Sequence, residues 1–217
     1  MAWENVGGVS WNSLPQQKQK IVKDKEEPTS NHRRTTECVA FSEKYLYKRA
    51  FSESHLIDCL GMEDFKEGYS YNFITGGDVD ALSYLKLIIR HNPRINYLLL
   101  STWVISAEDI LQLDKWLENG TIGKLDIYLG EIFPKTYKIE FGMIKKIIEK
   151  YQCGRVAVFR NHSKIFAGTT DKYSFGIQMS CNINTNPRTE NGCIQINDEI
   201  FKFYKEYFDG INSFNID

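Results

Sequence analysis

Segments typical of strands and of helices alternate through the middle of the chain, and this alternation restricts the fold more than any other feature. Three apolar stretches typical of strands lie at 69–75, 95–101 and 124–129. Each is followed by a segment whose apolar residues recur with a helical period, at 78–90, 107–118 and 134 to about 151. Short connections between such strands and helices predict an α/β fold, in which a β-sheet is flanked by helices on both faces.

The ends of two predicted helices carry typical boundary residues. Asp78 offers a carboxylate to the unpaired N–H groups of the first helical turn, and Pro93 follows the end of that helix. Ser106 has the same role for the second helix, with Asp109 three residues later, and Asn119-Gly120 follows its end. These residues support both helices independently of the apolar period.

The last third of the chain has a different pattern. Strand-like runs at 155–159 and 192–196 flank a polar region, and a final helix is predicted at 198–208. The late strands lie close together in the sequence, and no helix is predicted between them. Strands joined without a crossover helix pair in antiparallel fashion, so we expect a mixed sheet.

Residues 1–36 are polar and poor in aliphatic side chains. Such a composition buries too little apolar surface to fold by itself, so the sequence predicts a flexible N-terminal arm at 1–36 and one domain at 37–217. Trp3 and Trp11 are unusual in a solvated tail. Two interpretations stay open, a solvated tail and an arm that binds a neighbouring subunit or nucleic acid.

Charge and cysteine content exclude several classes of protein. The formal net charge is −1, so no general basic field attracts nucleic acid, although a local basic cleft is compatible with this value. The five cysteines have no Cys-x-x-Cys spacing, which predicts free thiols, a cytoplasmic location and no zinc site. No apolar run approaches the ~20 residues of a membrane span, so we expect no membrane partner.

Chemically capable side chains gather between the two late strands. His162 and Lys164 form a His-x-Lys pair, and Ser180 and Asn182 form a Ser-x-Asn pair. Glu190 follows shortly before the next strand. Because strands flank the region, we expect the sheet to bring these polar side chains to one place.

This order of residues resembles the signature of the phospholipase D superfamily, in which His-x-Lys is followed by Asp, then by Gly-Ser-x-Asn or Gly-Gly-x-Asn, and later by Glu. The chain has one His-x-Lys pair of this kind, as in the single-motif, nuclease-like members. It departs from the signature at two positions. Thr169 stands in place of the Asp, with Asp171 two residues later, and Met179 stands in place of the Gly. The resemblance implies a phospholipase D-like α/β domain within residues 37–217.

The resemblance also implies a chemistry, the metal-independent cleavage of a phosphodiester without a cofactor. In this chemistry one imidazole attacks phosphorus, which assigns His162 as the nucleophile, and a second imidazole gives a proton to the leaving alkoxide. Lys164 and Asn182 are suited to hold the non-bridging oxygens, and Glu190 is suited to orient an imidazole. Since the family uses two facing His-x-Lys sets, a chain with one set is expected to act as a homodimer.

Three further residues are candidate ligands of the substrate. Ser180 can add a hydroxyl donor and Arg188 a guanidinium for phosphate. Trp103 can stack on a base, although packing in the core is another use of this ring. The predicted function is a nuclease acting on DNA or RNA. The departures at Thr169 and Met179 leave open a second function, a catalytically degenerate protein that binds nucleic acid or takes part in an assembly.

Overall fold

The computed structural model describes residues 53–58, 65–76, 79–184 and 188–214 of the chain. The arm predicted at 1–36 and the predicted cap Asp78 lie outside the described residues. The strands are β1 (Ser70–Thr75), β2 (Ile95–Thr102), β3 (Leu125–Gly130), β4 (Val156–Phe159), β5 (Ile165–Thr170), β6 (Ser174–Met179) and β7 (Glu190–Ile196). The helices with assigned bounds are α2 (Ala81–His91), α3 (Ala107–Glu118), α4 (Phe133–Thr136), α5 (Lys138–Tyr151) and α6 (Asp198–Asp209), and a short helix lies at 53–58.

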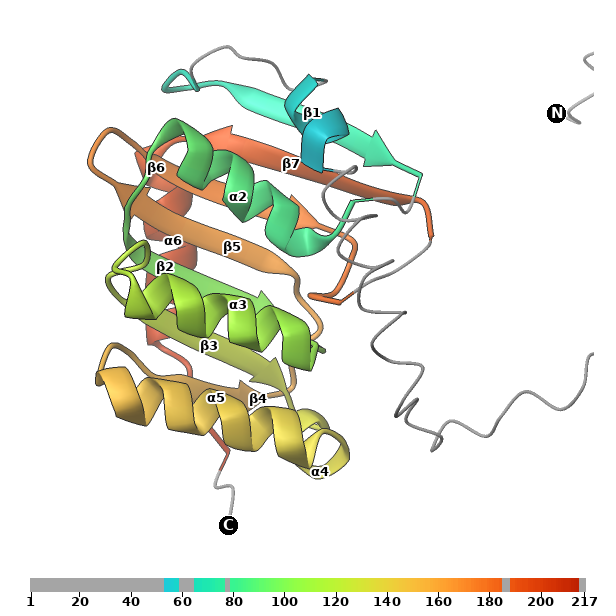
Figure 1. Cartoon of the computed structure of the whole chain (residues 1–217), viewed down its shortest axis with the longest axis vertical. Helices are drawn as coiled ribbons and strands as arrows, with labels where there is room; N and C mark the ends of the chain where they lie inside the picture. The colour runs from blue at the N-terminus through green and yellow to red at the C-terminus, as the bar shows by residue number, and fades with distance from the viewer. Residues whose placement is uncertain (1–52, 59–64, 77–78, 185–187, 215–217) are drawn as a thin grey trace, which may run out of the picture. The chain divides into compact units, whose positions relative to one another are not determined.

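Within the described part of the chain, seven strands form one sheet in the order β1-β7-β6-β5-β2-β3-β4. Strands β2, β3 and β4 are parallel, whereas β5, β6, β7 and β1 pair in antiparallel fashion. Helices α2, α3 and α5 cover one face of this sheet and α6 covers the other, as Figure 1 shows. The predicted mixed α/β sheet with helices on both faces is therefore confirmed.

Strand β2 has a continuous apolar sequence because both of its faces are buried. Leu98 and Leu100 belong to the larger core under α2, α3 and α5. Tyr97 and Leu99 point to the opposite face, where they join a smaller core that includes Phe208 of α6. Side chains of a strand alternate between its two faces, so a strand in the middle of this sheet needs an apolar residue at nearly every position.

Two helix predictions need correction. Helix α2 begins at Ala81 after Asp80, later than the predicted start at Asp78. The helix predicted from position 134 to about 151 is divided into α4 and α5, because Tyr137 leaves the helical region of the backbone with φ −117° and ψ 57°. By contrast, the Ser106 side chain accepts a hydrogen bond from the backbone N–H of Asp109, as predicted for the start of α3. Among the described residues, no helix is both long and apolar enough to cross a membrane.

The change from parallel to antiparallel pairing creates an edge at which many chain segments meet. Strands β2, β3 and β4 all end at this edge, which we call the carboxyl edge. Strand β5 begins there, with Ile165 opposite Ser101 of β2, and β7 begins there, with Glu190 opposite Thr75 of β1. The connection from β4 to β5, residues 160–164, therefore crosses the ends of β3 and β2.

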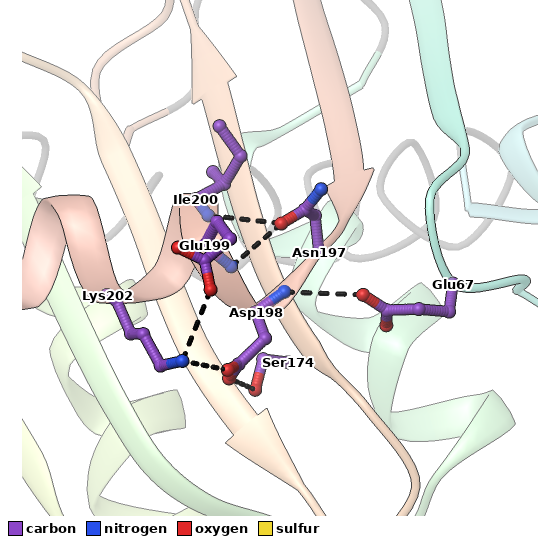
Figure 2. A network of polar contacts seen from close by, with 7 residues as sticks. All are labelled: Glu67, Ser174, Asn197, Asp198, Glu199, Ile200 and Lys202. Atoms are coloured by element: carbon purple, nitrogen blue, oxygen red, sulfur yellow. Dashed lines mark hydrogen bonds and ion pairs between the residues drawn. The ribbon is translucent and has the colours of Figure 1, made fainter.

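Helix α6 is fixed at its start by a polar network at the opposite edge (Figure 2). The Asn197 side chain accepts hydrogen bonds from the backbone N–H groups of Glu199 and Ile200, at 2.7 and 3.3 Å. Asp198 accepts a hydrogen bond from Ser174 of β6 and pairs with Lys202 one turn later. The network thus joins α6, on the second face of the sheet, to β6.

Replacing Asn197 with alanine should lower the free energy of unfolding by about 1 kcal/mol, because two N–H groups of the first turn lose their acceptor. Asn197→Ser should retain most of the stability, since a serine hydroxyl caps a helix about as well as an asparagine does. Urea unfolding of the two variants beside the wild type measures the difference. Equal losses in both variants would contradict a capping role.

Candidate active site

The predicted site residues lie at or next to the carboxyl edge, although they come from distant parts of the sequence. His162 and Lys164 lie on the connection that leads into β5. Ser180 directly follows β6, Asn182 lies two residues further on, and Glu190 is the first residue of β7. Antiparallel pairing of β5, β6 and β7 places the start of β5, the end of β6 and the start of β7 side by side. The predicted gathering of polar side chains by adjacent strands therefore corresponds to the observed topology.

His162 is exposed, and two neighbours contact its side chain. The ammonium of Lys164 lies 3.2 Å from Nδ1 of the imidazole and also donates a 2.7 Å hydrogen bond to the His162 carbonyl. The indole of Trp103 lies against the imidazole, with ring centroids 4.8 Å apart and planes tilted by 53°. Trp103 is thus brought to the site, where it packs on the predicted nucleophile.

Trp103 lies directly over the last residue of β3. A Cβ atom at Gly130 would lie 2.3 Å from Cδ1 of the indole and 3.0 Å from the carbonyl oxygen of Asn161. The close approach of the indole therefore requires glycine at this position. The indole thus contacts both the end of β3 and the imidazole of His162.

Ser180 and Glu190 form a second polar pair of the site. The Ser180 hydroxyl donates a short hydrogen bond to the carboxylate of Glu190 and accepts one from the backbone N–H of Asn191 at 3.0 Å. Glu190 is buried, with 8% of its surface exposed. A buried carboxylate needs hydrogen-bond donors or cations around it, and Ser180 supplies one of these donors.

Asn182 is positioned by the pairing of two loops. Its neighbour Ile183 pairs with the loop after β2, where its N–H donates to the carbonyl of Val104 and its carbonyl accepts from the N–H of Ser106. Asn182 itself is half-buried, and its carbonyl oxygen Oδ1 is buried without a hydrogen-bond partner among the described residues. The end of β2 and the end of β6 therefore set the place of Asn182 together.

Lys164 links the two halves of the site electrostatically. Burial lowers the pKa of its ammonium, while the negative charge of Glu190 acts in the opposite direction. Cys181 lies in the same environment, where burial and the charge of Glu190 raise the pKa of its thiol to about 12. Cys181 therefore stays protonated at neutral pH and is a weak nucleophile.

Comparisons with known proteins bear on the fold. No family model matches the sequence, and no curated protein matches it either. A solved structure of a polyphosphate kinase from Porphyromonas gingivalis is similar with a TM-score of 0.50 and 11% identity, over 67% of this chain and 26% of that one. That kinase is a phospholipase D-superfamily protein. The fold is phospholipase D-like.

A phosphatidylserine synthase from Haemophilus influenzae Rd KW20, of the same superfamily, is also among the similar structures. Its TM-score is 0.43 and its identity 13%, over 64% of this chain and 37% of that one. This chain thus spans well under two thirds of the length of either protein.

The two departures from the phospholipase D signature differ in their distance from the site. Met179 directly precedes Ser180, and its N–H donates to the carbonyl of Lys164, but its side chain points into the core. Thr169 lies five residues beyond Lys164 on β5, which is about 16 Å along an extended strand. It pairs with Tyr97 near the opposite edge, where Asp171 also lies and accepts a hydrogen bond from Asn96. The Met179 side chain is 9% exposed and belongs to the larger core.

The remaining candidate, Arg188, is exposed two residues before β7. A hydrogen-bonded cluster around the segment that carries His162 was not predicted from the sequence. It consists of Asn161, Ser101 and Ser163. The position of Asn161 next to the His-x-Lys pair was the one available signal, because the contact with Ser101 joins residues 60 positions apart.

The ammonium of Lys164 should lose its proton at a lower pH than that of Lys202. Burial lowers the pKa of Lys164, whereas hydrogen bonds to Asp198 and Glu199 raise the pKa of the exposed Lys202. Glu190→Gln should lower the pKa of Lys164 further, since it removes the negative charge that favours the ammonium. NMR titration of the lysine side-chain nitrogens measures both values. A Lys164 that titrates above Lys202 would contradict this view of the site.

Proposed function

We propose that this protein is a metal-independent phosphodiesterase that cleaves DNA or RNA with His162 as nucleophile, in an active site formed by two copies of the chain. One observation carries the proposal. The His162–Lys164 pair and the Ser180–Glu190 pair, which lie far apart in the sequence, meet at the carboxyl edge and are coupled through the charge of Lys164. An exposed imidazole beside a half-buried ammonium is suited to attack on a phosphodiester anion.

The proposed reaction has two steps. An imidazole nitrogen of His162 attacks phosphorus, an N–P bond forms, and the P–O bond to the leaving alkoxide breaks. The His162 imidazolium of the second copy gives its proton to that alkoxide. Water then attacks the phosphohistidine, gives its proton back to the second imidazole and releases the phosphate monoester together with free His162. One chain supplies one His-x-Lys pair, which is why the proposal includes a homodimer.

The other site residues have supporting roles in the proposal. Lys164 and the amide of Asn182 hold the non-bridging oxygens, whose charge the ammonium compensates. Ser180 differs from its predicted use, because its hydroxyl donates to Glu190; we propose that it fixes this carboxylate. Glu190 keeps Lys164 charged and orients an imidazole.

The substrate class rests on the surroundings of the site. Arg188 is exposed beside the start of β7, where a guanidinium can bind a backbone phosphate. Trp103 is half-buried at the carboxyl edge, so the uncovered part of its indole can contact a base. One of the similar solved structures is that of a polyphosphate kinase, whose name indicates phosphoryl transfer, and this supports the broader class of reaction.

A degenerate nucleic-acid-binding protein was the alternative suggested by Thr169 and Met179. Neither residue lies among the proposed catalytic groups, since Thr169 is near the opposite edge and Met179 is in the core. The side chains of both residues therefore lie outside the group of residues to which we assign the reaction.

The first test is cleavage of single- and double-stranded DNA and RNA by the full-length protein in EDTA. We expect cleavage that falls by about 10²–10⁴-fold or more in His162→Asn, because the variant lacks both the nucleophile and the acid. His55→Gln is a matched control, since this exposed histidine lies on the separate helix at 53–58. Binding without cleavage in the wild type would refute the enzyme and support the alternative function.

The second test concerns the shared site. Wild-type chains mixed with an equal amount of His162→Asn chains, under conditions of subunit exchange, should show about a quarter of the activity that wild type has at the same total chain concentration, because only dimers with two intact imidazoles react. Chains that act alone would retain about half. Light scattering on the same samples gives the molar mass, and an active monomer would refute the dimer.

A further inference from the structure

The segment that carries His162 is fastened by one buried side chain. Asn161 is 5% exposed and lies where residues 160–164 cross the ends of β3 and β2. Its amide nitrogen donates to the Ser101 hydroxyl of β2 at 2.9 Å and to the Tyr128 carbonyl of β3 at 3.2 Å. One side chain thus ties the crossing segment to both strands beneath it.

The other end of the same amide holds the residue after His162. The Asn161 carbonyl oxygen accepts hydrogen bonds from the backbone N–H of Ser163 at 3.0 Å and from its hydroxyl at 2.7 Å. The hydroxyls of Ser163 and Ser101 are 2.7 Å apart, which closes a ring of three side chains. Both neighbours of His162 in the chain are therefore fixed.

The amide of Asn161 uses its full hydrogen-bonding capacity in this arrangement. An asparagine has two N–H donors and one carbonyl acceptor with two lone pairs, and four bonds are present. Aspartate has no donor for Ser101 and Tyr128, and alanine makes none of the four bonds. The position is thus specific for an amide of this length.

The exposed imidazole of His162 depends on this arrangement for its place. Its ring contacts Trp103, which lies over Gly130 of β3, and the ammonium of Lys164. These contacts form only if the backbone at His162 stays over the ends of β2 and β3. A displacement of this segment would move the imidazole away from both Trp103 and Lys164.

We propose that Asn161 is the positioning residue of the site, which fixes the backbone of His162 so that its imidazole lies against Trp103 and beside Lys164. The effect on catalysis rests on the proposed function. The effect on the position of the imidazole is independent of the proposed function and is measured separately.

The test uses the ring current of Trp103, which shifts the imidazole protons of His162 in the NMR spectrum of the full-length protein. His162→Gln assigns the signal, and Trp103→Leu, which removes the aromatic ring, gives the part of the shift that is due to the indole. We expect Asn161→Ala to lose most of the shift of the His162 signal that the Trp103 indole causes. Asn92→Ala is the matched control, since Asn92 is equally buried at 4% exposure but ends α2 at the opposite edge, and it should leave the shift unchanged.

The catalytic arm measures turnover of the same variants on the best substrate. We expect kcat to fall by about 10–100-fold in Asn161→Ala with a much smaller change in KM, because misplacement of the nucleophile affects the reacting step more than substrate binding. If Asn161→Ala does not fold, both measurements are made on Asn161→Asp instead. This variant retains the acceptor for Ser163 and loses the donors to Ser101 and Tyr128.

An unchanged His162 shift in the Asn161 variants would overturn the proposal. If the Asn161 variants lose the shift but turn over substrate as fast as Asn92→Ala does, the proposed effect of Asn161 on catalysis is wrong. If the wild type shows no phosphodiesterase activity, the proposed function fails, and the NMR arm alone still decides whether Asn161 positions His162.

Discussion

The buried polar groups of the β4–β5 connection must be satisfied by the strand ends that it crosses, and the arrangement of the site depends on this constraint. Without the amide of Asn161, the connection would lose its hydrogen bonds to the Ser101 hydroxyl and to the Tyr128 carbonyl at these strand ends. The amide of Asn161 pairs with both of them and also with Ser163. The same hydrogen bonds that make the crossing possible therefore determine where the residue between Asn161 and Ser163 lies, and this residue is His162.

The change of strand direction at this crossing has a second consequence. Because β5, β6 and β7 return in antiparallel fashion, the start of β5 lies next to the end of β6, and the end of β6 next to the start of β7. Lys164, Ser180 and Glu190 then come within range of one another without a long loop, and rigid strands hold them. The bridge between Ile105 and Ile183 fixes the loop after β6 in the same way. An all-parallel sheet would place a helix between these segments.

The class of fold could be predicted from the sequence because local patterns of residues determine it. The apolar run of β2 and the cap of α3 by Ser106 depend on neighbours in the chain or on burial on both faces. The places of Thr169 and Met179 in the sheet could not be predicted from such local patterns. A sequence signature gives the spacing of residues but not the face or the end of a strand on which each residue lies. Asn161 was missed for a related reason, because its partners Ser101 and Tyr128 are on other strands. Strand pairing decides these contacts, and strand order is not a local property.

The site residues also work against the stability of the fold, which argues for a role in binding or chemistry. Burial disfavours the ammonium of Lys164, and Glu190 opposes this effect only in part, since the pKa of Lys164 remains lowered. The carbonyl oxygen of Asn182 is buried and has no hydrogen-bond partner among the described residues. An apolar side chain at position 164 would be buried without this desolvation of a charge. A phosphate anion bound at the carboxyl edge, as we propose, would offset the desolvation of Lys164.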